Sequence, residues 1–298
     1  MMSIYPKDSH FDFSDTKTLM ELLKRHGFYT NKSLGQHFLI SQKALSAIVN
    51  GADTDNKKNI LEIGPGVGVV TRALLEDGYN VTAIELDRRA IKILNETVGD
   101  FETAQVIEGD ILKINIAEIL KKNETWVIVG NLPYYITTPV IIAILEHYEK
   151  IDKAIFMVQK EVAERLCAKP DNKTYGSITV FCDIYSTVTT IAKVPKGAFM
   201  PPPNVDSAII CLEMRRKPII DKEDINIFSR VLRGSFQQRR KQICNSLMSA
   251  FDFSREVAET VLKNAGIAPC KRAENLTTKD FCRLTQTVKE YLLIKDQE

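Results

Sequence analysis

Between residues 59 and 168, short apolar runs rich in β-branched residues alternate with amphipathic segments of helical period. Strands that are separated by helices lie parallel in one sheet, with the helices covering its two faces. The pattern therefore predicts an α/β fold of the Rossmann type. The predicted strands are 59–63, 81–84, 104–107, 126–129 and 154–158, and the predicted helices are 67–76, 88–98, 139–148 and 160–168.

The pattern changes twice after this region. Runs at 178–185, 188–194 and 205–213 are β-rich without helices between them, which predicts antiparallel strands at one edge of the sheet. Beyond the basic stretch at 215–218 only helices are expected, at 221–235, 240–250, 254–264 and 277–292. We therefore expect an N-terminal extension (1–30), an α/β domain (31–215) and a small all-α domain (216–298), with the boundary at the Pro-containing stretch.

Charge is distributed unevenly along the chain. The total is 40 basic against 38 acidic residues, net +2, which suggests no particular partner. From residue 215 to the end, however, there are 17 Lys and Arg against 11 Asp and Glu, net +6. A basic terminal domain favours a polyanionic partner, although a solvated helical surface has a similar composition.

The six cysteines form no C-x-x-C pair, and no apolar run approaches the length of a membrane span. No signal peptide is evident either. We therefore expect reduced thiols, a cytoplasmic location and no membrane association.

A glycine-rich loop, Gly64-Pro65-Gly66-Val67-Gly68, follows the first strand and opens the next helix. Glycines at such a turn let the backbone bend sharply and let a ligand lie against the main chain. The spacing is G-x-G-x-G rather than the G-x-G-x-x-G of dinucleotide-binding proteins. A simple strand–helix turn needs fewer than three glycines, so we expect a ligand here.

Two acidic residues follow the next two strands. Glu85, with Leu86 after it, stands 21 residues beyond Gly64, where α/β nucleotide-binding folds place a carboxylate on ribose hydroxyls. Asp110, with Ile111 after it, is suited to an exocyclic amino group. The three features predict an adenosine-bearing ligand without a pyrophosphate. S-adenosylmethionine fits best, because its sulfonium and ammonium groups suit an acidic rim. A nicotinamide dinucleotide is the alternative.

The fourth strand leads into Asn131-Leu132-Pro133-Tyr134. The amino nitrogen of adenine is a poor nucleophile because its lone pair is delocalised into the ring. The Asn131 side-chain oxygen and the Leu132 carbonyl would accept its two N–H groups, while Tyr134 stacks on the base. This scheme needs positioning and charge stabilisation but no metal. A second aromatic residue, Phe199, precedes three prolines that would hold it over the base pocket. The alternative is that the Asn-Leu-Pro-Tyr block only turns the chain.

With these motifs the sequence resembles the KsgA family, the small-subunit rRNA adenine dimethyltransferases. The resemblance extends from about residue 30 to the end, in six blocks: Lys32–Leu39, Leu61–Gly68, Glu108–Leu112, Asn131–Pro139, Phe199–Ser207 and Phe236–Lys241. It implies a class I methyltransferase fold with a helical C-terminal domain. It also implies S-adenosylmethionine-dependent dimethylation of two adjacent adenosines in a hairpin loop near the 3′ end of 16S rRNA, in the 30S subunit, and a role in assembling that subunit.

The resemblance also assigns residues to the site. Those expected to bind the cofactor are His37, Leu39, Gly64, Gly66, Glu85, Leu86, Asp110, Ile111 and Asn131. Those expected to hold and activate the target base are Asn131, Leu132, Pro133, Tyr134 and Phe199. Many members of the family have Asn where this chain has His37.

In the helical domain, Arg239-Arg240-Lys241 follows Phe236 and is expected to bind RNA phosphates. A solvated helix face is the alternative. We expect a monomer.

There are four alternative functions. The first is a 23S rRNA methyltransferase of the macrolide-resistance type, which the Leu of Asn-Leu-Pro-Tyr and the developed helical domain disfavour. A DNA adenine methyltransferase would show Asn/Asp-Pro-Pro-Tyr. A non-catalytic assembly or transcription factor would need no cofactor pocket. A dehydrogenase would need a catalytic His or a Tyr/Lys pair, and none is evident.

Overall fold

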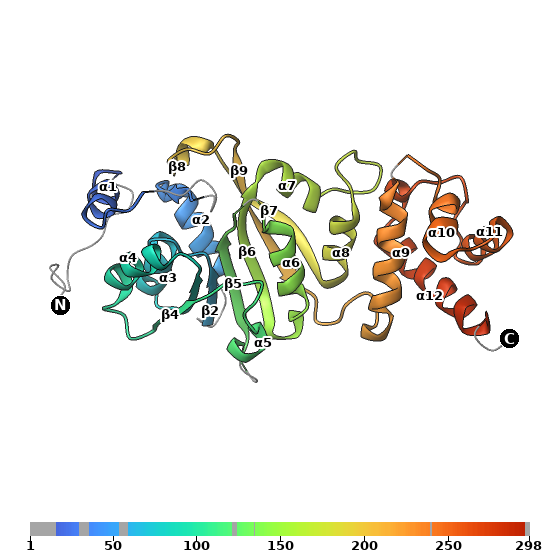
Figure 1. Cartoon of the computed structure of the whole chain (residues 1–298), viewed down its shortest axis with the longest axis horizontal. Helices are drawn as coiled ribbons and strands as arrows, with labels where there is room; N and C mark the ends of the chain where they lie inside the picture. The colour runs from blue at the N-terminus through green and yellow to red at the C-terminus, as the bar shows by residue number, and fades with distance from the viewer. Residues whose placement is uncertain are drawn as a thin grey trace. The chain divides into compact units, whose positions relative to one another are not determined.

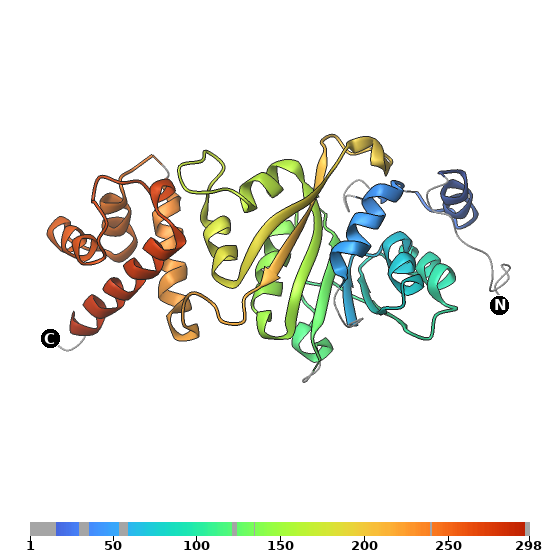
Figure 2. The same cartoon turned by 180° about the vertical axis from the view of Figure 1, so that it is seen from behind.

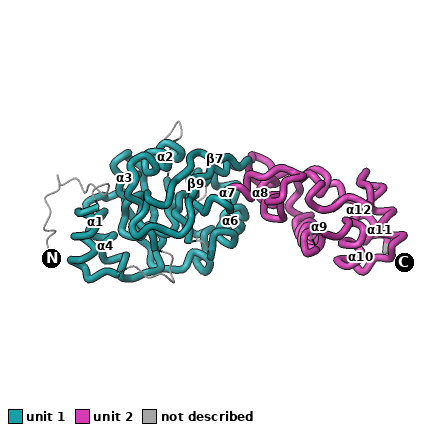
Figure 3. Tube along the Cα trace, turned by 90° about the horizontal axis from the view of Figure 1, so that it is seen from above, with its two compact units in different colours: residues 1–163, 187–214 teal, residues 164–186, 215–298 magenta. Residues whose placement is uncertain are grey.

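The computed structural model describes residues 16–29, 36–53, 59–120, 124–133, 135–238 and 240–295. The chain divides into two compact units, shown in different colours in Figure 3. Unit 1 comprises residues 1–163 and 187–214, and unit 2 comprises residues 164–186 and 215–298. The sequence-based division differs in two respects, since it assigns 164–186 to the α/β domain and separates 1–30 from it as an extension.

Unit 1 is built on a seven-stranded sheet whose order is β4-β3-β2-β5-β6-β9-β7. Strands β2 to β6 pair in parallel, and β9 pairs antiparallel with β6. The predicted α/β fold, a mostly parallel sheet with an antiparallel edge, is confirmed. Its strands are β2 (Asn59–Ile63), β3 (Asn80–Glu85), β4 (Ala104–Glu108), β5 (Trp126–Asn131), β6 (Ile151–Gln159), β7 (Ser186–Val194) and β9 (Ser207–Met214).

Helices lie on both faces of this sheet. Figures 1 and 2 show α2 (Gln42–Ala52) and α6 (Thr137–Leu145) on opposite sides. The helices α3 (Val69–Glu76) and α4 (Arg88–Val98) pack on the same face as α2. The buried side chains of these three helices form one apolar core with β2, β3 and β5. The short helix α5 (Ile116–Ile119) lies in the connection between β4 and β5, and the 3₁₀ turn Tyr148–Lys150 lies between α6 and β6.

The helix α1 (Thr16–Arg25) is part of this same core. Leu19, Leu22 and Leu23 are buried, as is Phe28 after the helix. The residues 16–28, which the sequence analysis places in an N-terminal extension, therefore contribute apolar contacts to unit 1. A two-stranded sheet of β1 (Phe38–Leu39) and β8 (Phe199–Met200) adds a second layer, in which Leu39 pairs with Phe199.

The segment 177–185 corrects a prediction. The β-rich run at 178–185 predicts a strand, but it lies in a helix, α8 (Ser177–Tyr185). Periodicity alone cannot separate a buried strand from a short buried helix, because both read as a continuous apolar run. Here Gly176 precedes the helix, and the Thr179 hydroxyl accepts the Gly176 N–H at 3.2 Å. That contact satisfies a backbone donor at the start of the helix.

Unit 2 is helical, as expected. α9 (Ile225–Gln237) packs against α8, α10 (Ile243–Phe251) and α12 (Thr278–Lys295), and α11 (Arg255–Asn264) packs against α10 and α12. The helix α7 (Lys160–Leu166) begins in unit 1 and ends in unit 2. The Tyr175 hydroxyl donates to the Leu276 carbonyl at 2.9 Å, which ties the 164–186 segment to the helices of this unit. Among the described helices, none combines the length and apolar character that crossing a bilayer requires.

Candidate cofactor and base site

A cavity opens at the carboxyl ends of β2, β3, β4 and β5, the edge at which open parallel sheets bind ligands. It contains residues from five separate stretches of the chain. The predicted site residues that line it are His37, Leu39, Gly64, Gly66, Glu85, Leu86, Asp110, Ile111, Asn131 and Pro133. The structure thus brings together every residue predicted to bind the cofactor.

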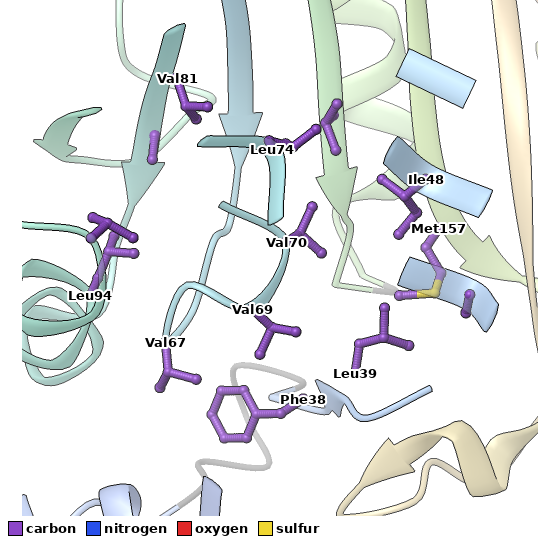
Figure 4. Packing of buried hydrophobic residues seen from close by; sticks show 14 of the residues in the cluster. Phe38, Leu39, Ile48, Val67, Val69, Val70, Leu74, Val81, Leu94 and Met157 are labelled. Carbon is purple, nitrogen blue, oxygen red and sulfur yellow. The ribbon is translucent and has the colours of Figure 1, made fainter. Parts of the chain in front are cut away.

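The glycine loop has the conformation that requires glycine. Gly64, Gly66 and Gly68 have φ angles of +69°, +60° and +93°, which side chains with a Cβ rarely adopt. A Cβ at Gly66 would also lie 3.3 Å from Cε1 of Phe38. Figure 4 shows the Phe38 ring beside Val67 and Val69, next to this loop. The β1 segment therefore closes directly onto the loop.

Glu85 has a fixed orientation at the end of β3. Its Oε2 accepts the Gly66 N–H at 2.9 Å, and its Oε1 accepts the N–H groups of Leu86 and Asp87, each at 2.8 Å. Burial raises the pKa of Glu85, and these three backbone hydrogen bonds oppose the rise. A carboxylate offers about four acceptor positions, so the group retains capacity for a ligand hydroxyl.

Asp110 stands at the end of β4. Its Oδ1 accepts the Leu112 N–H at 3.0 Å, and Lys113 Nζ lies 3.6 Å from its Oδ2. Ile111 is buried, whereas Leu86 on the neighbouring strand end is 52% exposed. Two apolar side chains and a carboxylate at adjacent strand ends form a suitable recess for an adenine ring and its amino group.

Asn131 is held by the β1 segment. Its Nδ2 donates to the His37 carbonyl at 3.1 Å. Because a carbonyl can only accept, this contact assigns the amide orientation and leaves Oδ1 as the acceptor at the cavity. The His37 ring Nδ1 lies 2.7 Å from the Pro201 carbonyl and must donate to it. His37 therefore links the end of β5 to the segment after β8.

Two other residues predicted to bind the target base, Leu132 and Phe199, are buried and do not line the cavity. Leu132 is buried, and its N–H donates to the Met157 carbonyl at 3.1 Å. Phe199 is 3% exposed and belongs to the apolar core of unit 1 rather than to the cavity lining. Tyr134 lies outside the described residues. The structure therefore gathers the predicted cofactor residues more completely than the predicted base-binding ones.

Glu62 is a cavity residue that the sequence analysis did not select. It is 2% exposed, and its Oε2 has no hydrogen-bond partner in the described part of the chain. Burial raises its pKa to about 8, the Thr71 hydroxyl nearby offsets part of that rise, and the charge of Glu85 adds to it. The signal was present in the sequence, since Glu62 directly precedes Ile63-Gly64 in a strand of apolar residues.

In unit 2, Arg240 and Lys241 are exposed between α9 and α10, and Arg239 lies outside the described residues. Within the described ranges, no group of three or more His, Cys, Asp or Glu side chains is arranged to hold a metal ion.

A family profile described as ribosomal RNA adenine dimethylase matches residues 27–290. The match covers the glycine loop, the acidic strand ends and Asn131. The chain belongs to the ribosomal RNA adenine dimethylase family.

Curated relatives within this family are similar over nearly their whole length. Ribosomal RNA small subunit methyltransferase A of Macrococcus caseolyticus is 40% identical over 290 residues, covering 94% of this chain and 97% of the relative. The protein of the same name from Streptococcus thermophilus is 40% identical over 286 residues, covering 94% and 98%.

Two solved structures are similar in fold to this chain. A dimethyladenosine transferase from Plasmodium falciparum has a TM-score of 0.73 and 25% identity, covering 85% of this chain and 98% of that one. The 23S rRNA methyltransferase ErmE has a TM-score of 0.65 and 26% identity, covering 85% and 99%.

Proposed function

We propose that the chain is an S-adenosylmethionine-dependent enzyme that dimethylates the amino groups of two adjacent adenosines in the 3′-terminal hairpin loop of 16S rRNA, within the 30S subunit. The observation that supports this most is the position of Asn131. Its side-chain acceptor lies at the same cavity as Glu85, Asp110 and the glycine loop. A methyl donor and an adenine amino group would therefore meet at the end of β5.

The cavity suits S-adenosylmethionine on chemical grounds. An unpartnered, buried carboxylate oxygen of Glu62 lies along the same wall as Glu85, and such an oxygen is costly unless a ligand compensates it. Glu85 would bind the ribose hydroxyls, and Asp110 the adenine amino group. When bound, S-adenosylmethionine supplies an electrophilic methyl group on a positively charged sulfur. The acidic lining matches that charge.

The protein groups act on the target adenine by orienting it. Asn131 Oδ1 and the Leu132 carbonyl would accept the two N–H groups of the amino nitrogen, which favours a pyramidal nitrogen with a directed lone pair. These acceptors also stabilise the positive charge that develops on the nitrogen during transfer. The His37 carbonyl holds the Asn131 amide in place beforehand, so little reorganisation is needed when the base enters.

The names of the relatives favour rRNA of the small ribosomal subunit as the substrate over rRNA of the large subunit. The curated relatives at 40% identity are named small subunit methyltransferases, whereas the 23S rRNA enzyme of similar fold is 26% identical. A target base must leave its stack to reach the cavity, so we infer a splayed loop as substrate. With this substrate we propose a cytoplasmic, monomeric enzyme that also takes part in small-subunit assembly.

The test is mass spectrometry of rRNA after incubation of unmethylated 30S subunits with enzyme and labelled S-adenosylmethionine. Dimethyladenosine at two neighbouring loop positions supports the proposal, and label only in 23S rRNA or DNA refutes it. Asn131→Ala should lower turnover by about 100-fold or more, as for the loss of one preorganised polar contact. Binding to 30S particles should persist, because phosphate contacts dominate that affinity. A variant with wild-type turnover would show that Asn131 is structural.

A further inference from the structure

A series of contacts connects the segment after α1 with Glu85. The buried Phe28 ring lies under the guanidinium of Arg89, with 5.1 Å between the Arg89 Cζ and the ring centroid. The same ring contacts Phe38, at 5.9 Å between centroids. Arg89 also donates to both carboxylate oxygens of Asp87, from Nε at 3.0 Å and from its terminal nitrogen at 2.7 Å. Phe28 and Asp87 therefore fix the Arg89 guanidinium from two directions.

Asp87 in turn fixes the turn that orients Glu85. Its carboxylate accepts the Arg89 backbone N–H at 3.0 Å, which caps α4, and the Gln36 amide at 2.9 Å. Its own backbone N–H donates to Glu85 Oε1, beside that of Leu86. The hydrogen bonds from Arg89 lower the pKa of Asp87 and keep this carboxylate ionised. The Glu85 carboxylate is thus oriented by a turn that Arg89 and Phe28 hold.

The segment that contains Phe28 is anchored at the far end of α4 as well. Arg25 and His26 both contact the Glu96 carboxylate, His26 Nε2 at 2.6 Å from Oε2. Leu19 and Leu22 bury against unit 1. Residues 16–28 therefore contact α4 near both of its ends, and Phe28 is the point at which they approach the cavity.

We propose that Phe28 and Arg89 are positioning residues for Glu85, which give the N-terminal segment a role in cofactor affinity without contact with the cofactor. This inference rests on the proposed function, in which Glu85 binds the ribose hydroxyls. Two of the three N–H groups on Glu85 belong to the Leu86–Asp87 turn. Loss of the Arg89 fork or of the Phe28 ring frees that turn, and the carboxylate then samples orientations that miss the ribose.

The experiment measures whether the ribose hydroxyl is still recognised. Isothermal titration compares S-adenosylhomocysteine with its 2′-deoxy counterpart in wild type, Phe28→Ala and Arg89→Ala. Wild type should prefer the hydroxylated ligand by about tenfold, the value of one hydrogen bond to a charged group. Both variants should lose most of that preference. Phe28→Tyr, which keeps the ring, should retain it.

Matched controls come from the adjacent residues. Tyr29 is 81% exposed, and Arg88 bonds to Glu108 instead of Asp87. Tyr29→Ala and Arg88→Ala should keep the tenfold preference. If Phe28→Ala fails to fold, Phe28→Leu fills the same space without an aromatic face, and Arg89→Lys keeps the charge without the fork. Each should still show a reduced preference.

The outcomes separate this inference from the proposed function. Variants that bind both ligands more weakly by one common factor, with the preference intact, would overturn the positioning role. A wild type that binds both ligands equally would overturn the ribose assignment of Glu85 and this inference with it. A wild type with the preference but without methylation of 30S subunits would refute the proposed activity and leave the positioning role supported.

Discussion

At the scale of single residues, Glu62 combines a cost in folding with a gain in binding. Because its pKa is raised to about 8, the folded state binds this proton more tightly than the unfolded state. Stability therefore falls as pH rises from about 4.5 to about 8. The cost at pH 7 is about 3 kcal/mol, at 1.36 kcal/mol per pKa unit. Glu62→Gln should flatten this pH dependence and raise stability near pH 7, as measured by urea unfolding.

The same substitution should have the opposite effect on the cofactor. A bound cation favours the ionised carboxylate, so wild-type affinity for S-adenosylmethionine should rise up to about tenfold per pH unit below pH 8. Glu62→Gln should bind more weakly, with no such slope in titration calorimetry. The exposed Glu102→Gln is the control and should behave as wild type. Equal slopes in wild type and Glu62→Gln would show that Glu62 does not face the positive charge.

At the scale of elements, the sequence predicts best where local pattern and burial agree. The helix at 88–98 has the predicted bounds, because its apolar period matches the face that it buries. The strand at 59–63 also has the predicted bounds, although it is buried on both faces, because a short apolar run directly before a glycine loop favours a strand. The strand predicted at 178–185 is wrong because a continuous apolar run carries no period that separates a strand from a buried helix. The role of Phe199 at the base pocket stays a prediction, and its pairing with Leu39, which is 160 residues earlier, cannot be read from local sequence.

The helix α1 shows how an apparently peripheral element joins the core. Leu19 is fully buried, whereas its neighbour Met20 is 58% exposed. Leu19→Ala should therefore lower the free energy of unfolding by about 2–5 kcal/mol, the range for truncation of a buried leucine. Met20→Ala should change it by less than about 0.5 kcal/mol. Denaturant unfolding of the full chain measures both, and equal small effects would show that α1 does not contribute to the core.

At the scale of the whole molecule, the charge is divided between an acidic and a basic part. Residues from 215 onward have a net charge of +6 within a chain of +2, so the earlier residues are net acidic. The acidic part contains the cavity that we propose binds the cationic cofactor, and the basic part contains Arg240 and Lys241 on an exposed segment. We therefore expect RNA affinity to depend on the basic part and on salt, and cofactor affinity to depend on the cavity carboxylates.

The last prediction tests this division. Arg240→Glu with Lys241→Glu should weaken binding to 30S particles, and it should flatten the dependence of log affinity on log salt. Each phosphate contact contributes about 0.7–0.9 to that slope, so the loss of two contacts lowers it by about 1.5.

The control is Lys263→Glu with Lys279→Glu, which makes the same change of charge at exposed positions of α11 and α12. Phosphate contacts made by Arg240 and Lys241 release counterions only at that segment, so the control pair should leave the slope nearly unchanged. If both double variants lower the slope equally, the net charge of the chain governs the affinity, and the 240–241 segment has no special role. Affinity for S-adenosylmethionine should stay unchanged in both variants, since neither pair lies at the cavity.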